Sequence, residues 1–283
     1  ELSSEFRYRK PVINKKTAAL AISQSGDTAD TLQAIREGKR HGALTLGIVN
    51  TVGSTIARET DAGVYNHAGP EIGVASTKAF ISQLEVLALL TIFLGRQRGM
   101  TEQEAKGIAE ALHDIPKKIE SILEKREEIA ALAKKYGAAR DFLFIGRTNN
   151  TPVAMEGALK LKELSYIHAE GCSAGEMKHG PIAMIDEKFP TFAVATKSSV
   201  YEKVVSNIQE IKARKGPVIA LASEGDTEIA ELVDDVVYVP ETIELLTPII
   251  NTVPLHLFSY YFAKQMGYDP DRPRNLAKSV TVE

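Results

Sequence analysis

Four side chains that could bind an anion lie in the stretch 23–28: Ser23, Gln24, Ser25 and Thr28. An apolar run at 18–22 is typical of a buried strand, and the pattern from 28 to 41 is that of a helix. A helix N-terminus presents free N–H groups and a positive dipole end, and Gly26 allows the backbone a close approach. The spacing therefore predicts a phosphate-binding loop. The alternative is a turn in which a hydroxyl caps the helix.

Three charged residues share one face of the helical pattern 152–166, because Glu156, Lys160 and Glu163 are spaced i, i+4, i+7. The helix follows an apolar strand pattern at 142–145, so it begins at the carboxyl edge of a parallel sheet, where ligands bind. A lysine lowers the pKa of a neighbouring carboxylate, and the pair could act as general acid and base. The alternative is an exposed, salt-bridged surface.

The stretch 166–181 is dense in His, Glu and Gly and shows little periodicity. His179 precedes Gly180-Pro181 and is therefore expected in a turn, where an imidazole can move protons near neutral pH. A metal site is the alternative, with candidate ligands His168, Glu170, Cys172, Glu176 and His179. Because no second Glu-x-x-His motif accompanies the one at 176–179, no metal is predicted.

Two more stretches carry candidate residues. The tail 269–283 is rich in Pro, Asp and Asn, so it is expected to be irregular, with its end docked on the body. Lys278 is either a surface lysine or, if it folds into a pocket, a Schiff-base nucleophile whose pKa desolvation lowers. Ser76 precedes a long helical pattern and is either an N-cap or a ligand contact at the edge that holds Ser23.

Strand and helix patterns alternate in two runs, which favours an α/β fold of parallel sheets covered by helices. The expected strands are 18–22, 44–49, 63–65, 142–145, 191–195, 218–222 and 236–239. The expected helices are 28–41, 54–58, 77–98, 101–114, 117–136, 152–166, 200–214 and 243–266. The predicted divisions are a first unit at 1–100, a helical connector at 101–137, a second unit at 138–267 and a tail at 268–283.

The second run repeats the first after about 173 residues, since Ile56-Ala57 matches Ile229-Ala230 and Asp61 matches Asp234. The first strand and helix of the second run have no counterpart in the first, which predicts a first unit without them. At the same shift, the stretch 23–26 falls on 196–199, which keeps hydroxyls but loses the glycine. One phosphate site per chain is therefore predicted.

Composition narrows the function class. The net charge of −3, with 44% hydrophobic and 25% charged residues, is that of a soluble globular protein and gives no reason to expect nucleic acid or an anionic membrane as partner. Cys172 is the single cysteine, so no intrachain disulfide can form, which favours a reducing cytoplasm. The most apolar stretch, 84–94, is interrupted by Glu85 and is expected to be too short to span a bilayer.

Five motifs occur together: 23–31, 71–78, 156–163, 176–181 and the terminal Arg-Asn-Leu-Ala-Lys-Ser-Val-Thr-Val-Glu at 274–283. In this order they resemble the glucosamine-6-phosphate synthase family, the glutamine:fructose-6-phosphate aminotransferases (isomerizing). The resemblance runs from end to end of the chain and covers that family's sugar isomerase half. It implies two tandem SIS (sugar isomerase) subdomains, each a flavodoxin-like three-layer sandwich with a mostly parallel sheet, and a catalytic C-terminal tail.

The resemblance also implies roles for single residues. The substrate-binding residues would be Ser23, Gln24, Ser25, Thr28, Val74, Ser76 and Ala277. Glu163 would move a proton between C1 and C2 of the sugar, assisted by Lys160. Lys278 would form an imine with the open-chain ketose. His179 would open the sugar ring, reaching into the partner subunit's site in a homodimer.

The implied reaction converts fructose 6-phosphate and ammonia to glucosamine 6-phosphate, with no cofactor. The family's glutaminase domain, which supplies ammonia from glutamine, and a Cys-Gly-Thr-Ser loop that also grips the sugar lie outside the resemblance. This chain is therefore not expected to use glutamine. Two alternatives are a non-catalytic SIS module that senses phosphosugars and a simple phosphosugar isomerase. Neither needs Glu163, His179 and Lys278 together.

Overall fold

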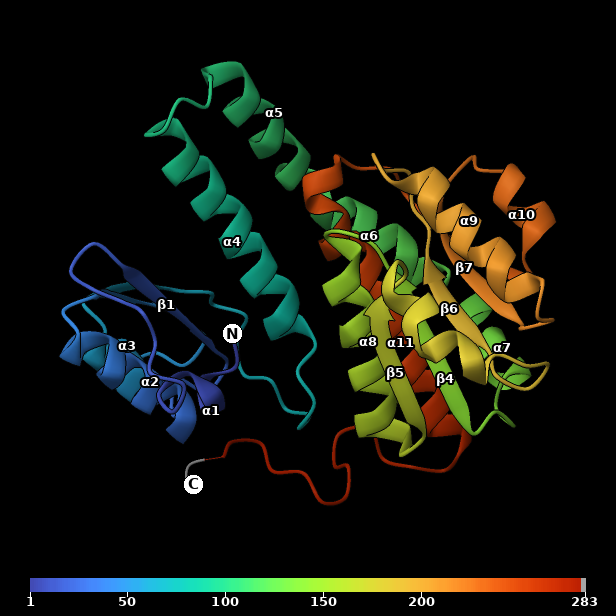
Figure 1. Ribbon diagram of the computed structural model, residues 1–283, viewed down its shortest axis with the longest axis horizontal. Coiled ribbons are helices and arrows are strands. Elements are labelled where there is room, and N and C mark those ends of the chain that lie inside the picture. The colour runs from blue at the N-terminus through green and yellow to red at the C-terminus, as the bar shows by residue number, and fades with distance from the viewer. Residues whose placement is uncertain (281–283) are drawn as a thin grey trace. The chain divides into compact units, whose positions relative to one another are not determined.

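The computed structural model describes residues 1–280, and the chain divides into two compact units (Figure 1). The first unit consists of residues 1–90 together with the C-terminal stretch from Arg274, and the second of residues 91–273. The tail from Arg274 therefore belongs to the same unit as the stretch 23–28, although the second unit separates the two in sequence.

The first unit holds a parallel sheet with the strand order β1-β2-β3. Its elements are α1 (Ser3–Phe6), β1 (Ala18–Ser23), α2 (Ala29–Arg40), β2 (Leu44–Val49), α3 (Thr55–Glu59), β3 (Ala62–Tyr65) and the first turns of α4 (Lys78–Arg96). Ser23, Val49 and Tyr65 are paired across the sheet, so the three carboxyl ends lie at one level. The core on the α2 and α3 side is small and contains Ala21, Ile35, Val49 and Ile56.

The second unit holds a parallel sheet with the strand order β5-β4-β6-β7-β8. It begins with the last turns of α4, followed by α5 (Glu102–His113), α6 (Ile115–Glu124), α7 (Arg126–Lys135), β4 (Asp141–Gly146), α8 (Asn150–Ser165) and β5 (His168–Ser173). It continues with two 3-10 helices, η1 (Glu176–His179) and η2 (Pro181–Met184), then β6 (Thr191–Val194), α9 (Tyr201–Lys212), β7 (Val218–Ser223), α10 (Glu228–Leu232), β8 (Asp235–Val239), η3 (Glu244–Leu246) and α11 (Thr247–Gln265). This order is that of flavodoxin-like sheets, which confirms the predicted fold class.

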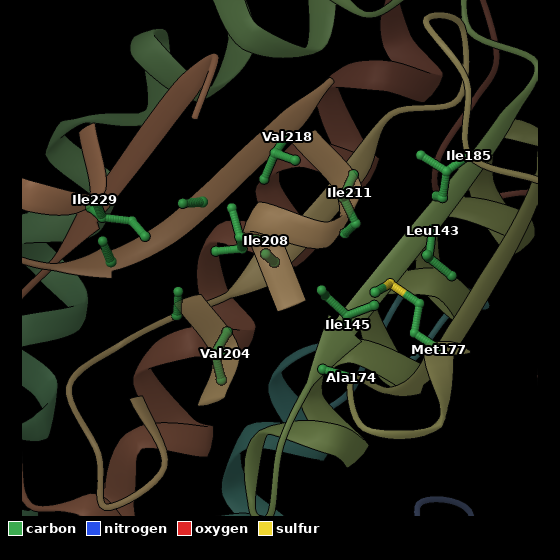
Figure 2. Packing of buried hydrophobic residues seen from close by; sticks show 14 of the residues in the cluster. Leu143, Ile145, Ala174, Met177, Ile185, Val204, Ile208, Ile211, Val218 and Ile229 are labelled. Atoms are coloured by element: carbon green, nitrogen blue, oxygen red, sulfur yellow. The ribbon is translucent and has the colours of Figure 1, made fainter. Parts of the chain in front are cut away.

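Alternation along β4 separates the two halves of the second unit's core. Leu143 and Ile145 face the cluster built with α9, which includes Ile208 and Ile211 (Figure 2). Phe142 and Phe144 face the other way. Phe142 packs edge-on against Phe258 of α11 with ring centroids 5.7 Å apart, and Phe144 stacks on Phe192 of β6 at the same distance. A continuous apolar strand is therefore buried on both faces, as its sequence predicted.

The internal repeat is also a structural one. Ala18 begins β1 and Thr191 begins β6, 173 positions later. Asp61 accepts the N–H of Thr45 at the start of β2, at 2.8 Å, and Asp234 accepts the N–H of Val218 at the start of β7, at 2.7 Å. The matched aspartates therefore have one structural role, which is to hold the start of the neighbouring strand. Strands β4 and β5 have no counterpart among the described strands of the first unit.

One expectation about elements was wrong, and strand β5 and the short helix α1 were not predicted. The stretch 117–136 is two helices, α6 and α7, because the chain leaves helical geometry at Lys125, with no Gly or Pro to mark the break. Strand β5 falls in the stretch without periodicity. As an edge strand it pairs with β4 alone, and Gly171 leaves room for the backbone of Met155 on α8. The short helix α10 was also not predicted.

The prediction that the apolar stretch 84–94 is too short to span a bilayer is wrong for the helix that contains it, α4. It runs for 19 residues, from Lys78 to Arg96, with Glu85 inside it, and is long and apolar enough to cross a membrane by those two criteria. The repeat supplies another reason for its composition, since α4 corresponds to α11, which is an apolar core helix of the second unit. Apolar length at α4 is thus a property of the repeated unit.

Candidate functional site

The stretch 23–28 forms a tight turn between β1 and α2. Ser23, the last residue of β1, is buried, and its hydroxyl accepts the N–H of Gly26 at 3.0 Å. The hydroxyl of Ser25 accepts the N–H of Asp27 at 3.2 Å. Thr28 occupies the N-cap position of α2, yet its side chain makes no capping hydrogen bond. The alternative of a simple hydroxyl cap therefore does not describe this turn.

Two features fix the shape of the turn. Gly26 has φ +71°, in the left-handed region, and a Cβ there would lie 2.5 Å from Cβ of Ser54. Asp27 accepts the N–H of Thr55 at the start of α3, at 2.9 Å, and the hydrogen bonds from the Thr55 backbone and then from its side chain hold the pKa of the Asp27 carboxyl below its usual value. The loop is thus preorganised by β2–α3 contacts.

The tail brings a lysine and a hydroxyl to this unit's carboxyl edge. Nζ of Lys278 donates to the carbonyl oxygen of Gly73 at 2.5 Å, and the hydroxyl of Ser279 lies 3.2 Å from that of Ser25. The N–H of Ala29, the first residue of α2, donates to the carbonyl of Val280 at 3.1 Å. The predicted docking of the tail occurs. Of the two alternatives for Lys278, the structure has the surface lysine, because its side chain is exposed.

The loop before α4 contains Gly73, which accepts the hydrogen bond from Lys278. Gly73 is next to Val74, and Ser76 follows, with its hydroxyl donating to Glu71 at 3.3 Å. Glu71 is buried and accepts the N–H and the hydroxyl of Thr77, at 2.5 and 2.9 Å. Glu71, and not Ser76, therefore supports the start of α4. Ala277 lies exposed in the tail beside Lys278.

The charged face of α8 is buried, so the alternative of a solvated surface is wrong. Glu156 and Lys160 are 8% and 2% exposed. Nζ of Lys160 lies 2.5 Å from a carboxylate oxygen of Glu163 and 3.6 Å from one of Glu156. Burying three charges is costly unless they are paired, and here the ammonium lies between two carboxylates. Glu163 is the least buried of the three carboxylate and ammonium groups, with its side chain 21% exposed.

His179 ends η1 with an exposed side chain, as the Gly-Pro that follows it predicted. Within residues 1–280, no three His, Cys, Asp or Glu side chains gather in a way that could hold a metal ion. Burial, and then the neighbouring Glu170 and Glu176, raise the pKa of the Cys172 thiol to about 11. This thiol is therefore protonated near neutral pH.

The second copy of the loop is already occupied by a carboxylate. Glu244 accepts the N–H of Ser199 at 3.0 Å and its hydroxyl at 2.9 Å, and Lys197 beside it pairs with Glu241 at 2.6 Å. The connection from β8 to α11 is only 240–246, whereas that from β3 to α4 is 66–77. The shorter connection brings Glu244 onto the loop, so the N–H and the hydroxyl of Ser199 are not available to a phosphate.

Sequence reasoning missed the partners that orient these residues. No local sequence pattern marked His256 or Glu244. His256 contacts Glu156 across 100 positions, and Glu244 contacts Ser199 across 45 positions. The contacts of Ser279 and Gly73 were missed for the same reason. Only the predicted docking of the tail pointed toward them.

Comparisons with known proteins agree with this geometry. A model of the SIS domain family matches residues 1–93 and 136–265. The glutamine–fructose-6-phosphate aminotransferase (isomerizing) of Thermus thermophilus is 56% identical over 284 residues, which covers all of this chain and 47% of that protein. The enzyme of the same name from Chlorobaculum tepidum is 53% identical and is covered to 46%. The chain thus spans about half the length of these curated relatives.

Among solved structures, the C-terminal domain of the glucosamine-fructose-6-phosphate aminotransferase from Francisella tularensis superposes with a TM-score of 0.91 at 37% identity, covering 96% of this chain and 78% of that one. A family model over most of the chain and a relative of this identity and coverage are sufficient to establish kinship. The chain belongs to the SIS domain family, in the group formed by the C-terminal domains of the glucosamine-fructose-6-phosphate aminotransferases.

Proposed function

We propose that this chain is the sugar isomerase half of a glutamine–fructose-6-phosphate aminotransferase, which converts fructose 6-phosphate and ammonia to glucosamine 6-phosphate. One observation carries the proposal. The tail brings the Lys278 amine to Gly73 and the Ser279 hydroxyl to Ser25, within the unit that holds the 23–28 loop. A loop suited to a phosphate and an amine suited to a ketone thus share one sheet edge.

In this proposal, Ser23, Gln24, Ser25 and Thr28 hold the phosphate. Val74, Ser76 and Ala277 contact the sugar. The Lys278 amine attacks the C2 carbonyl of the open-chain ketose, and water leaves as the imine forms. Ammonia then displaces the lysine, so that the nitrogen it brings stays on C2.

The proposed isomerisation uses the charged face of α8. Glu163 removes a proton from C1 and returns one to C2, while the C1 hydroxyl loses its proton as the aldehyde forms and the nitrogen on C2 gains one. Lys160 lies 2.5 Å from Glu163 and supports its charged form. The burial of this ion pair supports the role, because a buried carboxylate–ammonium pair gains strength from the low local dielectric.

We further propose that the protein works in the cytoplasm as a homodimer in which His179 opens the sugar ring in the partner's site. The exposed position of His179 on η1 is compatible with such a donation. A glutaminase region would supply the ammonia from glutamine. A non-catalytic SIS module that senses phosphosugars remains the competing proposal, because it needs the loop alone.

The test is reductive trapping. The full polypeptide in which this sequence occurs is incubated with fructose 6-phosphate and borohydride, and the peptides are analysed by mass spectrometry. The proposal expects a reduced sugar-phosphate adduct on Lys278 that is lost in Lys278→Arg, which keeps the charge. Binding of fructose 6-phosphate without any adduct on Lys278 supports the sensing module and overturns the imine.

The shared site has its own test. A Glu163→Gln chain and a His179→Ala chain are each expected to be inactive as homodimers. An equal mixture that re-pairs at random is expected to regain about a quarter of the activity, because about half of the dimers are mixed and one of the two sites in each is intact. Absence of recovery in mixed dimers, verified by differential tagging, would count against donation of His179 across the interface.

A further inference from the structure

A row of buried polar side chains extends from the charged face of α8 to helix α11. Nε2 of His256 lies 2.9 Å from Oε1 of Glu156, and both side chains are 9% exposed. The same oxygen lies 3.6 Å from Nζ of Lys160, which in turn lies 2.5 Å from Glu163. His256 is thus connected to the proposed base through two charged groups.

The packing of the two helices explains why His256 reaches Glu156. Gly157 lies where α8 meets α11, and a Cβ there would come within 2.8 Å of Cδ1 of Leu255 and 3.0 Å of Cδ1 of Phe144. The missing side chain allows the helices to approach closely at this level. Glu156 and His256 are the immediate neighbours of Gly157 and Leu255, so the close approach brings carboxylate and imidazole together.

The distances describe a competition for one ammonium. Lys160 has a carboxylate on each side, and it lies closer to Glu163 than to Glu156 by more than 1 Å. An ionised carboxylate only accepts hydrogen bonds, so Nε2 of His256 carries the proton in this contact. A second donor on Oε1 of Glu156 reduces the pull of that carboxylate on Lys160. The ammonium is left against Glu163.

We propose that His256 is a positioning residue, which occupies Glu156 and thereby keeps Lys160 on Glu163. The inference rests on the proposed role of Glu163 as the base. Without the imidazole, Lys160 moves toward Glu156, and Glu163 loses both its orienting partner and the charge that favours its ionised form. His256 itself touches no reacting atom in this account.

The variants His256→Gln and His256→Leu separate hydrogen bonding from packing, since glutamine keeps a donor and leucine does not. The matched control is His113→Leu, at an exposed position of α5. In the full polypeptide, kcat is expected to fall about 10-fold in His256→Leu, with KM for fructose 6-phosphate within twofold, because the phosphate loop is in the other unit. The acidic limb of the pH–rate profile is expected to move to higher pH. His256→Gln and His113→Leu should both stay within about twofold of the wild-type kcat.

Two outcomes overturn the proposal. One is a His256→Leu variant with the wild-type kcat and acidic limb. The other is a His256→Gln variant as impaired as His256→Leu, which would assign His256 to packing alone. Thermal unfolding of each variant verifies that the comparison is made between folded proteins.

A second measurement does not depend on activity. Crystal structures of the His256→Leu and His256→Gln variants are compared in the chain of residues 1–283. In His256→Leu, Nζ of Lys160 is expected to lie closer to Glu156 than to Glu163, and in His256→Gln it is expected to stay on Glu163. If the wild-type polypeptide transfers no ammonia, the proposed function fails while these distances still decide the inference. A Lys160 that stays on Glu163 in His256→Leu overturns the inference whatever the activity.

Discussion

The hydroxyl oxygens of Ser25 and Ser279 lie 3.2 Å apart, although 254 positions separate them in the chain. Ser25 belongs to the turn after β1 and Ser279 to the irregular tail. This contact therefore joins the two segments of the first unit, which the second unit separates in sequence. It also places Lys278 beside Gly73. The candidate sugar-phosphate loop and the candidate nucleophile are therefore held by one small body.

Replacing Ser25 by alanine should weaken the binding of fructose 6-phosphate about 10- to 100-fold, since one hydroxyl donor to a charged phosphate is worth about 1.5–3 kcal/mol. Isothermal titration calorimetry on the full polypeptide measures this affinity. Ser198→Ala is the matched control, because it removes a hydroxyl from the second copy of the loop. A control that lost as much affinity as Ser25→Ala would show that the first loop is not the specific site.

Replacing Gly26 by alanine should destabilise the first unit by about 2–4 kcal/mol. A left-handed conformation costs a non-glycine residue about 1–2 kcal/mol, and the added Cβ would also collide with Ser54. Gly53→Ala is the control, because its φ is similarly positive, at +73°, but nothing lies within 4 Å of the new Cβ. Denaturant unfolding should therefore show a loss of only about 1–2 kcal/mol for the control. Equal losses would contradict the role of the collision.

Replacing Glu244 by alanine should open the second loop to inorganic phosphate. The change frees the N–H and the hydroxyl of Ser199 at the start of a 12-residue helix, and such donors bind anions. The readout is the amide resonance of Ser199 during a phosphate titration, which should shift in the variant and stay fixed in the wild type. Glu241→Ala, which breaks the Lys197 pair but leaves Glu244 in place, should resemble the wild type. If the Ser199 resonance of the variant did not shift with phosphate, the loop would have lost its anion-binding shape.

Acid should remove the contribution of Asp27 to stability. The hydrogen bonds from Thr55 lower the pKa of this carboxyl in the folded state, so the ionised form stabilises the fold at any pH above about 4. The contribution is lost as the pH falls through the lowered value. The difference in unfolding free energy between wild type and Asp27→Asn should thus be constant from pH 5 to 8, remain below about 1 kcal/mol because the group is near solvent, and shrink in acid. A difference that grew toward low pH would reverse the sign of this argument.

The amino-acid sequence by itself determined the architecture of this protein. A continuous apolar strand such as 142–145 buries both of its faces only when helices cover both sides of the sheet. The alternation of strands and helices along the chain predicts that the sheets are parallel. The 173-residue repeat could be found in the sequence because Asp61 and Asp234 have the same role. Each accepts a hydrogen bond from the start of a strand 16 positions earlier in the chain. The hydroxyl-rich turn with its glycine was also evident, because a left-handed residue and a helix start are local properties.

Tertiary structure alone decided which residues work together. The charged face of α8 is the same sequence pattern whether exposed or buried, and only packing against α11 through Gly157 made it a buried ion pair with His256 attached. Likewise, the two copies of the loop look similar as sequence, yet a shorter connection turns the carboxylate of Glu244 onto one of them. Residues that contact each other across a hundred positions produce no periodic pattern in the sequence, because their contact depends on how whole helices and loops pack in the fold.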